Sequence, residues 1–104
     1  MSLYALQTAL LDRESGGDYS VTNSLGYIGG YQFGAQALET LGYLKQGASQ
    51  TGNSSMDNPN NWTGKGGASS KQAFLQNQAI QDRAVQENFN FNRKALENSG
   101  VIDS

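Results

Sequence analysis

Residues 13–33 read R-E-S-G-G-D-Y-S-V-T-N-S-L-G-Y-I-G-G-Y-Q-F and separate two helical patterns. On the N-terminal side, leucines recur at the i, i+3 and i+7 spacing of an amphipathic helix. Because glycine is a poor helix former, Gly16 and Gly17 are expected to end this helix and to leave Glu14 in or just past its last turn. Residues 19–31 are too rich in glycine for a helix, and we predict a short hairpin or an irregular insert there.

A second helix is expected on the C-terminal side of this insert. It would begin near Gln32 and end at Gly42, which has the residue type preferred at a C-terminal cap. Its buried face would consist of Phe33, Ala37, Leu38 and Leu41. Residues 45–68 follow with little periodicity, are rich in Gly, Ser and Asn, and contain the only proline. We predict a long polar loop there, partly ordered by Trp62.

Helical periodicity returns in the last third of the chain. Ser69 and Gln72 have the spacing of a capping box, which marks a helix N-terminus. The apolar pattern then continues to about Asn98, and a break near Asn77 would divide it into two helices. The sequence therefore predicts an all-α fold with an irregular insert after the first helix.

Composition limits the domain organisation and the partners. At 104 residues, with 37% hydrophobic residues, the chain suits a single domain over residues 1–104. The net charge of −2 and scattered Lys and Arg residues leave no basic stripe for nucleic acid. No apolar run approaches the roughly 18 residues of a membrane span, so we expect none. The N-terminus lacks the basic and hydrophobic segments of a signal peptide.

The chain contains neither cysteine nor histidine, and this limits its chemistry. Thiol nucleophiles, His-dependent triads and metal sites built on Cys or His are excluded. Acid and base groups of an enzyme would have to be carboxylates, Lys or Tyr. Glycoside cleavage is a large reaction class that uses carboxylates alone. No metal or organic cofactor is implied.

One set of residues resembles a known catalytic motif. Glu14-Ser15-Gly16, then Asn23-Ser24, then Gly26-x-x-Gly29-x-x-Gln32-Phe33 resemble the motif of lysozyme-like enzymes. The closest resemblance is to soluble lytic transglycosylases and goose-type lysozymes. It implies a small lysozyme-like helical domain that cleaves the β-1,4 bond between N-acetylmuramic acid and N-acetylglucosamine in peptidoglycan. Many transglycosylases have Gly-Leu-Met-Gln where this chain has Gly-Gly-Tyr-Gln, so hydrolysis and transglycosylation both stay open.

The resemblance assigns Glu14 as the general acid that protonates the leaving glycosidic oxygen. A position at a helix C-terminus suits this role, because the negative end of the helix dipole disfavours an ionised carboxylate. The residues expected to bind substrate are polar groups for hydrogen bonds and aromatic rings for sugar faces: Asn23, Ser24, Gln32, Tyr27, Tyr31 and Trp62.

A second catalytic carboxylate is not identified by the sequence. Asp18 and Asp57 are the two candidates, and neither spacing fixes a distance to Glu14. Without a partner, Glu14 would act first as acid and then as base, with the substrate's own C6 hydroxyl or N-acetyl group taking part. We favour this single-carboxylate arrangement.

Another class of function fits the same sequence. The domain could bind peptidoglycan without cleaving it, or serve as a structural domain of a phage tail or secretion apparatus. As an enzyme, the domain is expected to act in the periplasm or cell wall. Without a signal peptide, delivery would depend on a phage, a secretion system or a fused domain of a larger protein.

Overall fold

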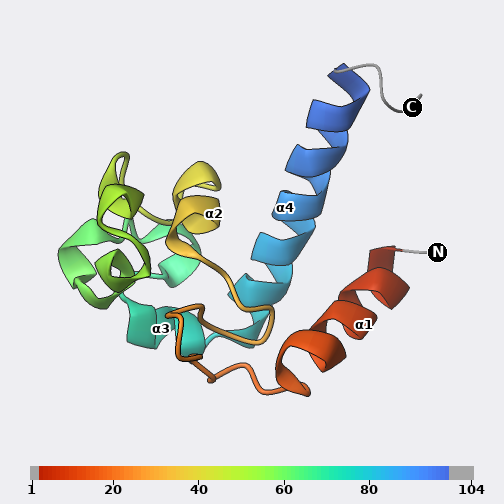
Figure 1. Ribbon diagram of the computed structural model, residues 1–104, viewed down its shortest axis with the longest axis horizontal. Coiled ribbons are helices and arrows are strands. Elements are labelled where there is room, and N and C mark those ends of the chain that lie inside the picture. Colours follow the sequence, from red (N-terminus) through yellow and green to blue (C-terminus); the bar gives the residue numbers. More distant parts are fainter. Residues whose placement is uncertain (1–2, 99–104) are drawn as a thin grey trace.

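The computed structural model describes residues 3–98, and nearly all of their regular structure is helical (Figure 1). The α-helices are α1 (Leu3–Ser15), α2 (Ala35–Thr40), α3 (Lys71–Leu75) and α4 (Gln78–Asn98). The 3₁₀-helices between α2 and α3 are η1 (Ala48–Thr51), η2 (Asn53–Asp57), η3 (Pro59–Asn61) and η4 (Lys65–Gly67). Within the described residues the backbone forms isolated antiparallel bridges but no sheet, so the predicted all-α class is confirmed.

The long helix α4 lies between two groups of elements (Figure 1). On one side it packs against α1, and on the other side lie α2, α3 and the 3₁₀-helices. Residues 16–34, which form the insert, connect the two sides and contact the first turns of α4. There, Gln81 hydrogen-bonds to both Tyr19 and Gly30. Among the helices of residues 3–98, none combines the length and the apolar character of a membrane span.

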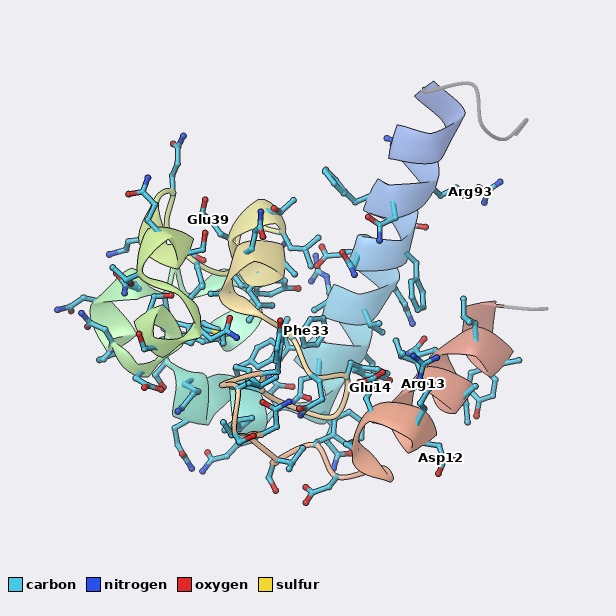
Figure 2. All side chains as sticks on the ribbon, in the orientation of Figure 1. Asp12, Arg13, Glu14, Phe33, Glu39 and Arg93 are labelled. Carbon is cyan, nitrogen blue, oxygen red and sulfur yellow. The ribbon has the colours of Figure 1, made fainter. Side chains whose placement is uncertain are left out.

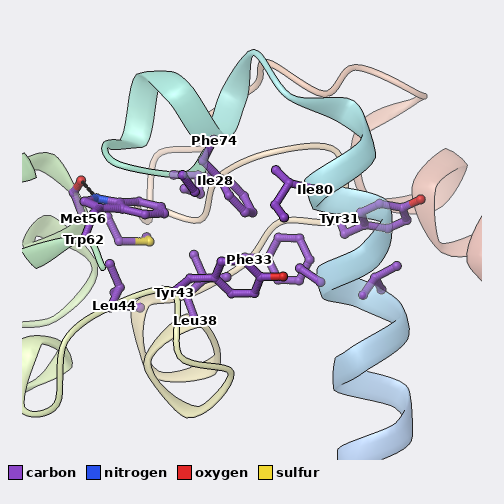
Figure 3. Packing of buried hydrophobic residues seen from close by; sticks show 14 residues of the cluster. Ile28, Tyr31, Phe33, Leu38, Tyr43, Leu44, Met56, Trp62, Phe74 and Ile80 are labelled. Carbon is purple, nitrogen blue, oxygen red and sulfur yellow. Dashed lines mark hydrogen bonds between the residues drawn. The ribbon is translucent and has the colours of Figure 1, made fainter. Parts of the chain in front are cut away.

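The core is built around Phe74 of α3, which is completely buried (Figure 3). Its ring centroid lies 5.6 Å from that of Phe33, 6.0 Å from Tyr43 and 5.5 Å from Trp62. Edge-on and tilted aromatic pairs at such distances are favourable beyond the area they bury, by about 0.5–1.5 kcal/mol each. The ring cluster thus joins α3 to the insert through Phe33, to the segment after α2 through Tyr43, and to the segment between η3 and η4 through Trp62.

The amphipathic interpretation of the first helix is only partly right. Its bounds agree with the prediction, but Leu6 is 43% exposed, and among residues 4–15 the buried side chain is that of Gln7. Leu10 and Leu11 are half-buried. The reason is that α1 packs on α4 and on the insert along a narrow strip of its surface.

The second helix begins later than predicted. Gln32 has a φ of 57°, in the left-handed region, which is incompatible with a right-handed helix. α2 therefore begins at Ala35. At the other end, Gly42 has a φ of 87° directly after the C-cap residue Leu41, which agrees with the predicted glycine cap.

The last helical region follows the prediction with one correction. Ser70, and not Ser69, caps α3, because its Oγ accepts a hydrogen bond from the backbone amide of Ala73 at 3.1 Å. The break near Asn77 is confirmed. Its side-chain oxygen accepts from the backbone amide of Ile80 at 3.1 Å, which stabilises the new helix start.

The polar loop predicted over residues 45–68 contains more structure than expected. It is wound into 3₁₀-helices, and Met56 and Trp62 enter the core. The indole Nε1 of Trp62 donates to the backbone oxygen of Met56 at 2.8 Å (Figure 3). This hydrogen bond satisfies the buried indole and closes the segment on itself.

Candidate active site

Glu14 lies in the last turn of α1, as predicted, and its side chain is 31% exposed. Figure 2 shows it on the side of α1 that faces α4, whereas Asp12 points away from the other helices. Arg13 Nε lies 3.5 Å from Glu14 Oε1, but the Arg13 side chain is 82% exposed. Such an exposed ion pair contributes little free energy, so Arg13 does not fix the Glu14 carboxylate in place.

A groove runs beside this helix between α1, α2 and α4. Leu10, one helical turn before Glu14, forms part of its wall. The other lining residues come from the insert, from α2, from α4 and from η2: Tyr27, Tyr31, Gln32, Phe33, Gly34, Gln36, Ala37, Asn53, Val85 and Asn88. The volume of about 370 Å³ is at the lower end of the range for small-ligand sites, about 300–1,000 Å³. No charged residue is among these lining residues.

Gln32 is the groove residue with the most unusual backbone. Within residues 3–98 it is the one non-glycine residue with a positive φ, 57°. This conformation costs about 1–2 kcal/mol and persists only where the surroundings impose it, most often at functional sites. Its Nε2 donates to the backbone oxygen of Gly29 at 2.9 Å, which holds the side chain against the insert.

Tyr31 has a different role from the one predicted. It is 7% exposed, so it offers little ring surface to a sugar. Its hydroxyl donates to Asp82 Oδ1 at 2.6 Å and accepts from Gln7 Nε2 at 3.1 Å. Burial, together with the hydrogen bond to Asp82, raises the pKa of Tyr31 above its ordinary value. The neutral Tyr31 side chain therefore links α1 to α4 through hydrogen bonds to Gln7 and Asp82.

A second tyrosine binds the same carboxylate. The hydroxyl of Tyr19 donates to Asp82 Oδ1 at 2.6 Å, and Gln86 Nε2 donates to Gln7 Oε1 at 3.1 Å. Burial raises the pKa of Tyr19, with the hydrogen bond to Asp82 adding to the effect. The network fixes the segment after Glu14 and the segment before Gln32 to the same turn of α4.

Trp62 does not fit its predicted role as a sugar platform. It is 4% exposed and its ring packs on Phe74 in the core. Tyr27 remains a candidate, since it is 38% exposed and lines the groove.

Asn23 and Ser24 lie outside the groove. Asn23 Oδ1 accepts from the backbone amides of Leu25 at 2.9 Å and Tyr27 at 3.0 Å, so its side chain stabilises the turn. Ser24 lines a separate hollow of about 300 Å³ together with Asp57. Asn53 borders both this hollow and the groove.

Neither candidate for the second carboxylate lines the groove, and Glu14 itself is not among the lining residues, although Leu10 one turn earlier is. Asp18 is exposed and accepts hydrogen bonds from the Ser20 hydroxyl at 2.6 Å and backbone amide at 2.8 Å, which hold the pKa of Asp18 below its usual range. Asp57 forms an ion pair with Lys71. The described residues also contain no cluster of three or more metal-ligating side chains.

The sequence did not reveal the residues that hold the site together: Gln7, Gln81, Asp82 and Gln86. The feature of the sequence that could have indicated them is the polar pair at positions 81 and 82, which stands beside the apolar positions Ile80 and Ala84 of α4.

Comparisons with models of protein families, with curated proteins and with solved structures found no match to this chain.

Proposed function

We propose that this chain cleaves peptidoglycan glycan strands at the β-1,4 bond between N-acetylmuramic acid and N-acetylglucosamine, on a lysozyme-like helical domain. The observation that carries the proposal is the position of Glu14. It closes α1 on the side that faces α4, one turn from Leu10, which lines an uncharged groove together with the strained Gln32. The expected place of action is the periplasm or cell wall.

Glu14 acts as the general acid in this proposal. Its side chain is partly covered and lies in the last turn of α1. Its proton passes to the glycosidic oxygen as the bond between that oxygen and the anomeric carbon breaks. Gln32 and Tyr27 line the groove beside α1 and supply an amide and a half-exposed ring for the sugar.

None of Glu14, Asp18 and Asp57 is a lining residue of the groove, but Glu14 lies one helical turn from the lining residue Leu10, so the single-carboxylate form of the reaction is favoured. After giving up its proton, the Glu14 carboxylate accepts one from the attacking group. That group is water in a hydrolase, which leaves a reducing end. In a lytic transglycosylase it is the C6 hydroxyl of the same sugar, which leaves an anhydro end.

The test uses purified peptidoglycan sacculi and three proteins: wild type, Glu14→Gln and Asp12→Asn. Asp12 is an exposed carboxylate two residues earlier on the same helix, which makes it a matched control. We expect Glu14→Gln to lower the rate of fragment release by about 100-fold or more, as loss of a general acid does, with Asp12→Asn close to wild type. Full release by Glu14→Gln, or no release by folded wild type, would contradict the proposal.

A further inference from the structure

The helix that carries Glu14 contributes little to the hydrophobic core, and it lies at the edge of the fold beside α4 (Figure 1). None of residues 4–15 is among the buried hydrophobic side chains, which begin at Ile28 in chain order. Leu10 and Leu11 are half-buried where they pack against that core. Because docking of a helix depends chiefly on buried apolar surface, α1 is held to the rest of the fold by a weak contact.

A polar side chain completes the attachment of α1. Gln7 is buried, its Nε2 donates to the Tyr31 hydroxyl at 3.1 Å, and its Oε1 accepts from Gln86 Nε2 at 3.1 Å. Water takes the place of such partners when a helix moves away, so the net contribution of these hydrogen bonds to docking is small. They fix the position of α1 on α4 more than they strengthen the contact.

A pair of glycines separates α1 from the next anchored residue. Gly16 and Gly17 have φ values of 66° and 91°, and a Cβ atom at either position would meet no atom of the described residues within 4 Å beyond the adjoining ones. Tyr19, two residues further, is fixed to α4 through hydrogen bonds to Asp82 and Gln81. Since glycine changes backbone conformation readily and nothing packs on this pair, residues 16–17 can act as a hinge.

We propose that α1 undocks from the fold as one unit about Gly16 and Gly17, while the core formed by residues 28–85 stays folded. The role of this motion rests on the proposed function. Glu14 lies two residues before the hinge, and Leu10 forms part of the groove wall, so undocking removes the acid and opens the groove together. An open groove admits a glycan strand from the side, and docking then brings Glu14 to the bound strand. The docking equilibrium of α1 thereby regulates the site.

Amide hydrogen exchange of the wild-type protein measures the undocking without any substrate. An isolated helix of 13 residues is marginal in water, so the amides of undocked α1 exchange. NMR at urea concentrations below the unfolding transition compares α1 with residues 80–85 of α4. We expect protection factors at least about tenfold lower in α1, with a weaker urea dependence because undocking exposes little surface. Equal protection and equal urea dependence in the two helices would overturn the inference.

Gln7→Ala separates undocking from global stability. It should raise the exchange rates of α1 by about five- to tenfold, the effect of losing one or two hydrogen bonds, and leave residues 80–85 unchanged. Thr8→Ala, at the exposed neighbouring position, should change neither set of rates by more than about twofold. Equal acceleration in α1 and in residues 80–85 would show that Gln7 stabilises the whole fold, which contradicts independent undocking.

An engineered disulfide tests the link to activity. The chain contains no cysteine, so Leu11→Cys combined with Gly30→Cys introduces a single pair. A Cβ atom at Gly30 would lie 2.5 Å from Leu11 Cδ1, so the two side chains start from adjoining positions, as a disulfide requires. Gly30 has no positive φ, so its backbone accepts a side chain.

The oxidised double variant should hold α1 docked. We expect the protection of α1 to rise to that of residues 80–85, and the release of fragments from sacculi to fall at least about tenfold below that of the reduced form. Dithiothreitol should restore both, and wild type with and without dithiothreitol is the control. A locked protein that cleaves sacculi as fast as its reduced form would overturn the regulatory role of undocking.

The two proposals fail separately in this design. If wild type releases nothing from sacculi but α1 exchanges by independent undocking, the hinge stands and the cleavage proposal is wrong. If sacculi are cleaved and α1 exchanges only with residues 80–85, the cleavage proposal stands and the inference about α1 is wrong.

Discussion

The side chain of Gln81 accepts a hydrogen bond from the backbone amide of Gly30 at 2.8 Å, and it is completely buried. Its Nε2 donates to the backbone oxygens of Tyr19 at 3.0 Å and Phe74 at 2.9 Å. One side chain of α4 thus satisfies buried backbone groups from both halves of the insert and from α3. In this way α4 fixes the shape of the segment that follows Glu14.

Replacement of Gln81 by leucine should therefore be strongly destabilising. The change leaves the amide of Gly30 and the carbonyl groups of Tyr19 and Phe74 without this partner, and each unsatisfied buried group costs about 1–3 kcal/mol. We expect the free energy of unfolding in urea to fall by at least ~3 kcal/mol. Gln72→Leu, at an exposed position of α3, should change it by less than ~0.5 kcal/mol. Equal stabilities of the two variants would contradict this account of Gln81.

Gly30 is required for space. A Cβ atom at this position would lie 2.5 Å from Leu11 Cδ1 and 3.3 Å from the ring of Tyr19. Gly30→Ala should therefore push α1 away from the insert and cost about 1–3 kcal/mol, as overpacking usually does. The double variant with Leu11→Ala removes the closest atom, so the two changes together should cost less than the sum of the single ones. Simple additivity in thermal unfolding would show that the contact is unimportant.

Glu87 provides a pH-dependent contribution to stability. Burial opposes its ionisation, but hydrogen bonds from Tyr43 at 2.5 Å and Lys65 at 3.0 Å outweigh it and hold the pKa of Glu87 below its ordinary value. Arg83 also lies nearby, with Nε 3.8 Å from Oε2. Because folding lowers this pKa, the stabilisation is complete above the unfolded value, about 4.3, and is lost as the pH falls through the folded value.

Glu87→Gln should accordingly be less stable than wild type by about 1–2 kcal/mol at pH 7, because it loses the charge in these hydrogen bonds. The difference should shrink as the pH is lowered from 5 to 3, where the wild-type carboxylate becomes protonated. Urea unfolding at pH 7, 5, 4 and 3 measures this. A difference that stays constant over this range would show that the charge of Glu87 contributes nothing.

Local rules predicted several features of the fold correctly. The glycine pair after Ser15 ended α1, Gly42 took the left-handed conformation after α2, and Asn77 separated α3 from α4. Each of these depends on the conformational preference of one or two residues, which the sequence states directly. For the same reason Glu14 could be placed at the end of its helix before the structure was known.

Long-range packing could not be predicted in the same way. Gln81 and its partner Gly30 are 51 residues apart, as are Tyr31 and its partner Asp82, and no local pattern indicates such pairs. Trp62 and Tyr31 were assigned to sugar rings because aromatic residues serve both cores and binding sites. Only the fold shows that their rings are covered. The strained backbone of Gln32 was likewise invisible, since its residue type gives no sign of a positive φ.

The most direct test of the central claim is mass spectrometry of the products that wild-type protein releases from purified sacculi. If Glu14 protonates the bond between N-acetylmuramic acid and N-acetylglucosamine, the products will be muropeptides cut at that bond, with reducing or anhydro ends on N-acetylmuramic acid. The same fragments will be absent with Glu14→Gln. Products cut in the peptide stems, or intact sacculi after incubation with folded wild type, would contradict the account.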